Sequence, residues 1–317
     1  MNSKPLVSIS LITYNQQDFI AASIESALDQ DYENLEIVIG DDCSSDSTWD
    51  IVQRFKSLYP DKIKAFRNPK NLGITNNSNE ALNRCAGKYV AFFAGDDLLM
   101  PNKISSQVSL MEANEKVVLT YHEVEMFRSH DNATILNNSR RGFSNAHVPV
   151  TGLASKVAEM VIQTTNGFMP AMSVMTRRSA IPHTGFDVRV PVVSDWLMWI
   201  EILANSDRDA IVEYLPKKLA RYRRHDSNVT SEPQKCSPDL YITLAIVESK
   251  YPWFLSNIDK SMARVRYSSG IAYILSGSEV LGRRFLLLSL RSRWVSWKIL
   301  YWLAVTYAPS LLKLRPK

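Results

Sequence analysis

The chain has 317 residues, of which 45% are hydrophobic and 22% charged, as expected for a soluble globular protein of one large domain or two ordinary ones. Its net charge of +5 arises from residues 283–317, which contain eight Lys or Arg and no Asp or Glu. The remaining chain is slightly acidic, which argues against a nucleic-acid-binding protein and indicates a basic carboxyl-terminal surface.

The amino terminus and the cysteines indicate a cytoplasmic protein. The first residues, "MNSKPLVSIS", contain no long apolar core, so we expect no signal peptide. Cys43, Cys85 and Cys236 are scattered without metal-ligand spacing, and we interpret them as reduced thiols.

Strands and helices are predicted to alternate over the first hundred residues. The strands are rich in β-branched and aromatic residues, and the helices have apolar residues at helical spacing. We expect strands at 6–13, 35–40, 63–68 and 89–94, and helices at 17–30, 47–59 and 75–85. This alternation predicts an α/β fold of right-handed βαβ units, Rossmann-like, with a mostly parallel central sheet flanked by helices.

The rest of the chain is less regular. A helix at 102–114 and a strand at 117–127 are followed by a polar loop or lid at 128–150 and a second patterned block at 157–224. Residues 232–239, "EPQKCSPD", are predicted to be a linker, and 239–317 to be mostly helical. We therefore expect an α/β domain over 1–230 and a helical, basic and aromatic extension over 231–317.

Polar clusters follow three of the predicted strands. They are "TYN" (13–15), "DDCSSDS" (41–47) and "GDD" (95–97). Because the carboxyl ends of parallel strands form the ligand-binding edge of an open α/β sheet, these clusters predict a binding site there.

The adjacent carboxylates Asp96 and Asp97 suit a hard divalent cation, Mg²⁺ or Mn²⁺, which would relieve their repulsion and stabilise charge on a departing diphosphate. A plain polar turn is the alternative interpretation.

The acidic residues after the second strand are predicted to divide into ligand contacts and helix caps. We expect Asp41 to contact a nucleobase or ribose, and Asp46 or Ser47 to cap the following helix. The chain has neither a G-x-G-x-x-G motif after the first strand nor a P-loop, which argues against a dehydrogenase or a kinase.

Two segments resemble glycosyltransferase family 2, whose members have the GT-A fold. They are "PLVSISLITYNQQDFIAASIESALDQDYENLEIVIGDDCSSDST" and "NLGITNNSNEALNRCAGKYVAFFAGDD", and the resemblance extends over about 5–230. It implies inverting transfer of a sugar from a nucleotide-diphosphate sugar to an acceptor hydroxyl. Residues of about 1–100 would bind the nucleotide sugar, and residues of about 101–230 would form the acceptor side.

The resemblance also implies roles for single residues. Many members carry an acidic residue where this chain has Ala94, so the division of labour between the two aspartates that follow is open. By resemblance, Thr13, Tyr14 and Asn15 would line the base pocket, Asp41 would contact the base, Asn71 would lie near the donor, and Asp96 and Asp97 would hold the ribose and the metal.

Asp195 is the candidate general base. It precedes the apolar helix "WLMWIEIL", whose terminal amides would orient it, although a plain helix cap is the alternative. Trp196 and Trp199 are expected in the core. His225, in "RYRRHDS", is expected to reach the donor diphosphate or the metal, or else to be an ordinary surface residue.

The basic tail combines its cations with several Trp and Tyr residues. Its longest uncharged run, Ile299–Leu312, is shorter than the roughly 20 residues that a spanning helix needs. We expect helices that lie on an anionic inner-membrane leaflet, with a helical cap or a dimer contact as the alternative.

These observations predict a metal-dependent glycosyltransferase, peripheral on the cytoplasmic face of the inner membrane. It would transfer a sugar from a UDP-linked donor to a lipid-linked glycan in polysaccharide or O-antigen biosynthesis, and bind no nucleic acid. One alternative is a sugar nucleotidyltransferase, which normally has a glycine-rich amino-terminal loop that "SLITYNQQDF" lacks. The other is a catalytically inactive nucleotide-sugar-binding protein at the membrane.

Overall fold

The computed structural model describes residues 4–135, 150–165, 169–226, 228–229, 233–290 and 297–307. The chain divides into two compact units. The first comprises Met1–Val161 and Asn166–Asp226, and the second Ile162–Thr165 and Ser227–Lys317. Most of the predicted loop or lid at 128–150 lies outside the described residues, as do parts of the basic tail.

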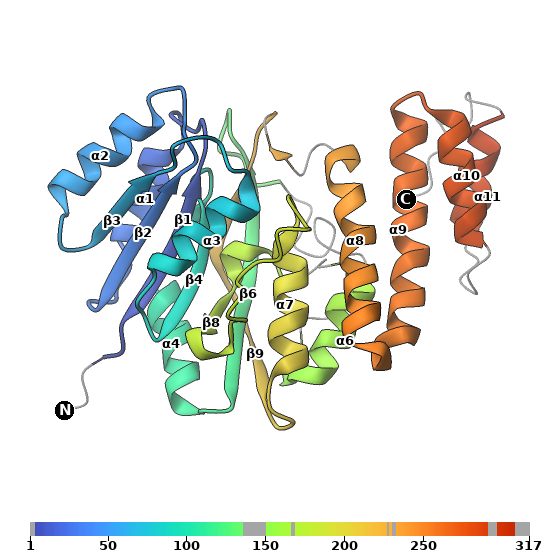
Figure 1. Cartoon of the computed structure of the whole chain (residues 1–317). Coiled ribbons are helices and arrows are strands. Elements are labelled where there is room, and N and C mark those ends of the chain that lie inside the picture. The colour runs from blue at the N-terminus through green and yellow to red at the C-terminus, as the bar shows by residue number, and fades with distance from the viewer. Residues whose placement is uncertain are drawn as a thin grey trace. The chain divides into compact units, whose positions relative to one another are not determined.

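One nine-stranded sheet forms the frame of the first unit (Figure 1). Its strands, in spatial order, are β3 (Ile63–Arg67), β2 (Leu35–Asp41), β1 (Val7–Thr13), β4 (Tyr89–Ala94), β8 (Met175–Arg177), β6 (Val117–Arg128), β9 (Ile211–Arg224) and β5 (Leu98–Leu99), and β7 (Gly152–Leu153) pairs with β9. The neighbouring pairs among β1 to β4 are parallel, as are β6 and β9, whereas β8 runs antiparallel to both its neighbours. The predicted α/β class with a largely parallel sheet is therefore confirmed.

The helices connect these strands close to the predicted positions. They are α1 (Ile20–Leu28), α2 (Thr48–Leu58), α3 (Ile74–Arg84), α4 (Lys103–Ala113), α6 (Ala154–Thr164) and α7 (Ser194–Asn205). Alternate residues of β1, such as Ile9 and Leu11, are fully buried in one apolar cluster with Ile20 and Ile24 of α1. On the other face of β1, the Ser8 hydroxyl donates to the buried Glu36 carboxylate of β2. The period of two thus separates an apolar face from a polar one.

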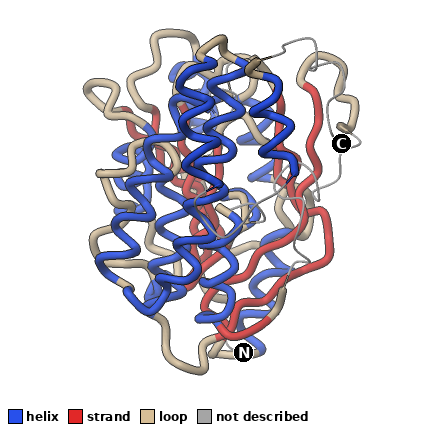
Figure 2. Tube along the Cα trace, turned by 90° about the vertical axis from the view of Figure 1, so that its right-hand side faces the viewer, coloured by secondary structure: helices blue, strands red, loops and turns tan. Residues whose placement is uncertain are grey.

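Four helices make up most of the second unit, and Figure 2 shows long helices packed side by side. They are α8 (Pro233–Lys250), α9 (Leu255–Leu275), α10 (Glu279–Leu290) and α11 (Trp297–Val305). The predicted linker at 232–239 is wrong, because α8 begins at Pro233 and contains Pro238. Proline is favoured in the first turn of a helix, as Pro233 is, whereas Pro238 lies inside α8, where it removes one backbone hydrogen bond and its ring crowds the carbonyl four residues earlier. No helix among the described residues is long and apolar enough to cross a membrane.

A buried polar cluster joins α4 to β6 in the first unit. The Lys103 ammonium is fully buried and donates to Gln107 Oε1 at 2.7 Å, and the Gln107 amide donates to Thr120 Oγ1 at 3.1 Å. Burial lowers the pKa of Lys103 to about 7. Burial, with the nearby Lys103 charge, also holds the pKa of His122 well below its usual value.

The Lys103 cluster predicts how stability depends on pH. An unfolded lysine keeps its proton up to about pH 10.4, whereas the folded Lys103 pKa is about 7, so between these values the unfolded chain binds more protons. The free energy of unfolding should therefore rise with pH in urea denaturation between about pH 7 and 9. Lys103→Met should abolish this rise, and Lys70→Met, at an exposed position, should preserve it. A flat or falling wild-type profile would contradict the prediction.

Candidate active site

Three strands end together at one edge of the sheet, as their polar clusters predicted. Thr13 at the end of β1 lies opposite Asp41 at the end of β2. On the other side of β1, the Gly95 N–H donates to the Ile12 carbonyl at 2.9 Å and so sets the start of the "GDD" turn beside the "TYN" turn. The predicted convergence at the carboxyl edge is therefore present.

Hydrogen bonds tie the turn after β1 to the turn after β2. The Asn15 N–H donates to Ser44 Oγ at 2.9 Å, and Asn15 Oδ1 accepts from the Ser45 N–H at 2.8 Å. Asn15 has a positive φ of 50°, which asparagine tolerates better than most residues. Thr13 is buried, whereas Tyr14 is 46% exposed. Of the predicted base-pocket residues, Tyr14 and Asn15 are thus exposed to a ligand, whereas Thr13 is not.

The two aspartates that end β2 hold the neighbouring loops. Asp41 is fully buried, and its carboxylate accepts from the Ser44 N–H at 3.0 Å and lies 3.3 Å from Arg67 Nε. Asp42 accepts from the N–H groups of Leu72 and Gly73 at 2.8 and 2.9 Å. The sequence analysis assigned no role to Asp42 or Arg67. Their contacts, with the loop at Leu72 and with Asp41, join residues that are far apart in the sequence.

The loop that Asp42 holds contains Asn71. The Asn71 side chain is exposed, and its Oδ1 accepts from the Gly73 N–H at 3.1 Å, where Gly73 has a φ of 82°. Of the two predicted caps of α2, Ser47 occupies the N-cap position, and the side chain of Asp46, one residue earlier, accepts from the Thr48 N–H at 3.0 Å through Oδ1. Ser47, the alternative cap, makes no side-chain cap hydrogen bond.

The adjacent carboxylates at the end of β4 have different surroundings. Asp97 is 1% exposed, and its Oδ1 accepts from the Arg223 N–H at 2.9 Å. Burial, and then the charge of Asp96, raise the pKa of Asp97 well above its usual value. The Asp96 carboxylate is instead partly exposed and lies 3.1 Å from His225 Nε2. The structure thus brings together the predicted Asp96 and His225, which are 129 positions apart.

Arg223 holds this turn through its side chain as well. Its Nε donates to the Asp96 carbonyl at 2.7 Å, and its guanidinium lies over the rings of Phe19 and Phe127 at 5.0 and 4.7 Å. The Phe19 ring also contacts the His225 ring, with centroids 4.6 Å apart. Phe19 is a site residue that the sequence analysis missed, because no local motif singles it out, whereas the basic run that contains Arg223 predicts only added charge facing phosphates.

Asp195 lies in the first turn of α7 and is half-buried, with its Oδ1 accepting from the Trp196 N–H at 2.8 Å. The start of α7 is anchored to the start of α3, because Thr75 Oγ1 donates to Ser194 Oγ at 2.8 Å. Trp196 and Trp199 are buried, which confirms their predicted place in the core. Trp199 packs edge-on against Phe92 of β4, so α7 is fixed to the strand that leads to Asp96.

The Asp96–His225 pair supplies two side-chain ligands that fit a divalent cation. A carboxylate oxygen and an imidazole nitrogen at 3.1 Å are donors that Mn²⁺ accepts, and the side chains are 14% and 10% exposed. Within the described ranges, no group of three or more His, Cys, Asp or Glu residues is placed to hold a metal ion. Two protein ligands leave coordination positions for diphosphate oxygens and water, as Mg²⁺ commonly requires.

Comparison with known proteins agrees with this fold. Residues 8–180 match Glycosyl transferase family 2, more than half of the chain. A relative from Escherichia coli, UDP-Glc:alpha-D-GlcNAc-diphosphoundecaprenol beta-1,3-glucosyltransferase WfgD, is 31% identical over 73% of this chain and 81% of its own length. The chain therefore belongs to glycosyltransferase family 2, which confirms the predicted family and enzyme class.

Another relative with the same described reaction, WfaP of Escherichia coli, is 43% identical over 116 residues, 37% of this chain. That match spans 45% of WfaP, and matches to EpsE and TuaG of Bacillus subtilis span 40% and 43% of those proteins. The chain thus spans less than half the length of these relatives.

Solved structures share the fold at low sequence identity. TarS 1–349 of S. aureus, in complex with UDP-GlcNAc, has a TM-score of 0.65 at 17% identity, with 96% of this chain and 87% of TarS 1–349 covered. Mannosyltransferase PcManGT of Pyrobaculum calidifontis, in complex with GDP-Man and Mn²⁺, has a TM-score of 0.63 at 16% identity, with 99% and 81% covered. These similarities confirm the predicted GT-A fold.

The crowding around Gly95 predicts the effect of a single methyl group. A Cβ at this position would lie 2.6 Å from Gln16 Oε1, 2.8 Å from Ile20 Cδ1 and 2.9 Å from Thr13 Oγ1. Gly95→Ala should therefore lower the free energy of unfolding by about 1–3 kcal/mol in urea denaturation. Gly152→Ala, whose Cβ would have its nearest neighbour 3.8 Å away, is the matched control. Equal stability of the two variants would contradict this packing.

Proposed function

We propose that the protein transfers a sugar from a UDP-linked donor to a hydroxyl of a lipid-linked glycan, in a reaction that requires a divalent metal ion. The observation that carries this proposal is the Asp96–His225 pair at the carboxyl edge of the sheet, beside the tied turns after β1 and β2. The descriptions of WfaP and WfgD, which name a UDP-glucose donor and a diphosphoundecaprenol-linked acceptor, support this substrate class.

The donor would bind along the edge formed by β2, β1 and β4. In this proposal Tyr14 stacks on the nucleobase, Thr13, Asn15 and Asp41 shape the base pocket, and Asn71 lies near the donor. Mutual hydrogen bonds already fix these turns, so donor binding would order few further residues.

Asp96 and His225 would hold the metal ion, Mn²⁺ or Mg²⁺. When bound, the ion supplies positive charge that neutralises the diphosphate and stabilises it as a leaving group. Asp97, the second predicted metal residue, would support the metal site indirectly, because its buried carboxylate holds the turn that carries Asp96.

Asp195 would accept the proton of the acceptor hydroxyl as that oxygen attacks the anomeric carbon. The Trp196 N–H fixes one of its carboxylate oxygens, and α7 is anchored on β4 and α3. Attack opposite the leaving diphosphate would invert the anomeric configuration. A lipid-linked acceptor would place the reaction at the cytoplasmic face of the inner membrane.

The metal assignment can be tested by donor-product binding. Asp96→Asn and His225→Ala should each weaken the Mn²⁺-dependent binding of UDP by about tenfold or more in calorimetric titration, because the first removes the negative charge of a ligand and the second removes a ligand, and a tenfold loss corresponds to about 1.4 kcal/mol. Asp50→Asn, at an exposed position of α2, should bind as the wild type does. If both site variants keep the wild-type gain in affinity on adding Mn²⁺, the metal site lies elsewhere.

The role of Asp195 as general base can be tested by a variant that affects transfer but not donor-product binding. Asp195→Asn keeps an oxygen that accepts from the Trp196 N–H but removes the proton acceptor, so UDP affinity should be unchanged while transfer falls by about 10²–10⁴-fold. Release of UDP from a nucleotide-sugar panel, measured with a lipid-linked acceptor, reports this loss. Full transfer activity in the variant would rule out Asp195 as the base.

A further inference from the structure

Two helices of the second unit have large apolar side chains on their exposed sides. On α10 these side chains are 38–65% exposed and recur at helical spacing, and on α11 they are 55–72% exposed. We name this set the α10–α11 surface: Val280, Leu281, Leu287 and Leu288 of α10, and Trp297, Leu300 and Tyr307 at α11. Several large apolar side chains exposed on one side of a helix indicate an interaction site.

The opposite sides of both helices already pack within the unit. A Cβ at Gly282 would lie 2.6 Å from Ile274 Cγ1 and 2.7 Å from the Gly270 carbonyl, so α10 approaches α9 as closely as its backbone permits. On α11, Ile299 and Trp302 are buried in the cluster that contains Ile274. Because these faces are occupied, the helices cannot rotate to bury the α10–α11 surface instead, and a helix apolar on both sides needs a second apolar environment.

Cations accompany this surface. Arg284 is exposed and lies one helical turn from Val280 and from Leu288, in the middle of the apolar face of α10. The Arg283 guanidinium lies 4.0 Å from the ring centroid of Tyr307. In the described parts of α10 and α11, Glu279 is the one acidic residue, and the sequence from 283 to 317 contains none.

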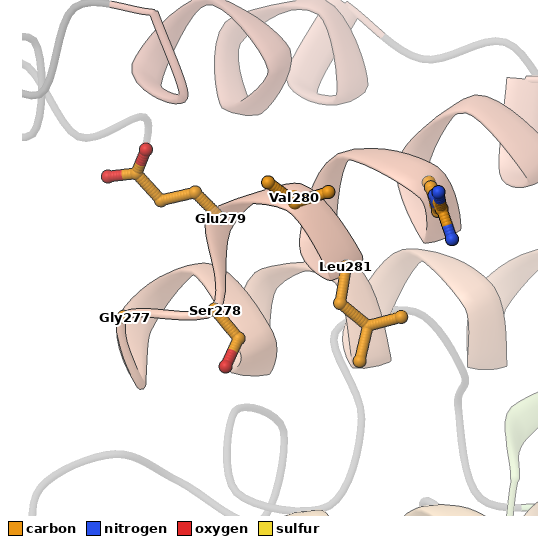
Figure 3. Close-up of a pocket in the computed structure, with 6 residues that line it drawn as sticks. Gly277, Ser278, Glu279, Val280 and Leu281 are labelled. Carbon is orange, nitrogen blue, oxygen red and sulfur yellow. The ribbon is translucent and has the colours of Figure 1, made fainter.

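A shallow hollow lies at the start of α10. Its volume is about 440 Å³, and it is lined by Gly277, Ser278, Glu279, Val280, Leu281 and Arg284. Figure 3 shows the Glu279 carboxylate pointing away from Ser278 and Leu281.

We infer that the α10–α11 surface docks on an anionic lipid bilayer. A second copy would bring the same excess of cations to the contact, since residues 283–317 contain eight Lys or Arg and supply no negative charge to compensate them. An anionic leaflet supplies that charge, and arginine, tryptophan and tyrosine suit its interface. With 12 and 9 residues the helices are about 18 and 14 Å long, against a hydrocarbon core of about 30 Å, so they lie on the bilayer.

The inference deepens the proposed function, whose lipid-linked acceptor it would bring within reach. The test is co-sedimentation of the full chain with phosphatidylcholine vesicles, with and without phosphatidylglycerol. The variants are L287S/L288S and, separately, R284E, which tests charge at one exposed position if the double variant does not fold. The matched control is L58S/V188S, because Leu58 and Val188 of the first unit are equally apolar and 64% and 59% exposed.

The wild type and the control should sediment with anionic vesicles and stay in solution with neutral ones. Both surface variants should lose about fivefold or more of the bound fraction, since apolar burial and anionic attraction both contribute. Unchanged vesicle binding in the surface variants, or no vesicle binding by the wild type, would overturn the inference. A wild-type dimer that the surface variants lose while they still bind vesicles would also overturn it, because the surface would then pair two copies of the chain. Mn²⁺-dependent UDP binding, measured in parallel, should be equal in the wild type, the two surface variants and the control. If none of them binds UDP but vesicle binding behaves as expected, the result counts against the proposed function and not against the membrane inference.

Discussion

The arrangement of the active-site edge depends on the buried carboxylate of Asp97. A carboxylate removed from water must find hydrogen-bond partners within the protein, and the Arg223 N–H supplies one at 2.9 Å. That bond joins the end of β4 to the end of β9 across 126 positions of sequence. Since Arg223 also donates to the Asp96 carbonyl, the turn is held at two points, and the Asp96 carboxylate is directed to His225.

A second buried aspartate, Asp42, holds the backbone after β2 in the same way. Asp42 is buried and accepts from the N–H groups of Leu72 and Gly73, so it fixes the loop that presents the exposed Asn71. In both places a buried aspartate holds the backbone, while a neighbouring side chain remains accessible. Tyr14 stands on a turn that is tied in a similar way, by backbone-to-side-chain bonds. Rigid presentation of a few accessible groups is what a nucleotide-sugar site at a sheet edge requires.

Local patterns were sufficient to predict the first four strands and the helices between them. An alternating or β-branched run such as Val7–Thr13 indicates a buried strand without reference to distant residues. The meeting of strand ends followed from the parallel topology. What the sequence did not disclose depends on distant contacts: which aspartate of the pair is buried, the role of Arg223, and the insertion of β8 between β4 and β6. The helix that begins at Pro233 was mistaken for a linker because proline was weighed as a breaker rather than as a first-turn residue.

We propose that a metal ion held at the edge of the sheet by Asp96 and His225 receives the donor diphosphate. The most direct test is an anomalous-difference map from crystals of the protein soaked with UDP and Mn²⁺. We expect one strong manganese peak in contact with an Asp96 oxygen, with His225 Nε2 and with the diphosphate. A diphosphate bound with no peak beside these two side chains, or a peak that contacts neither, would contradict it.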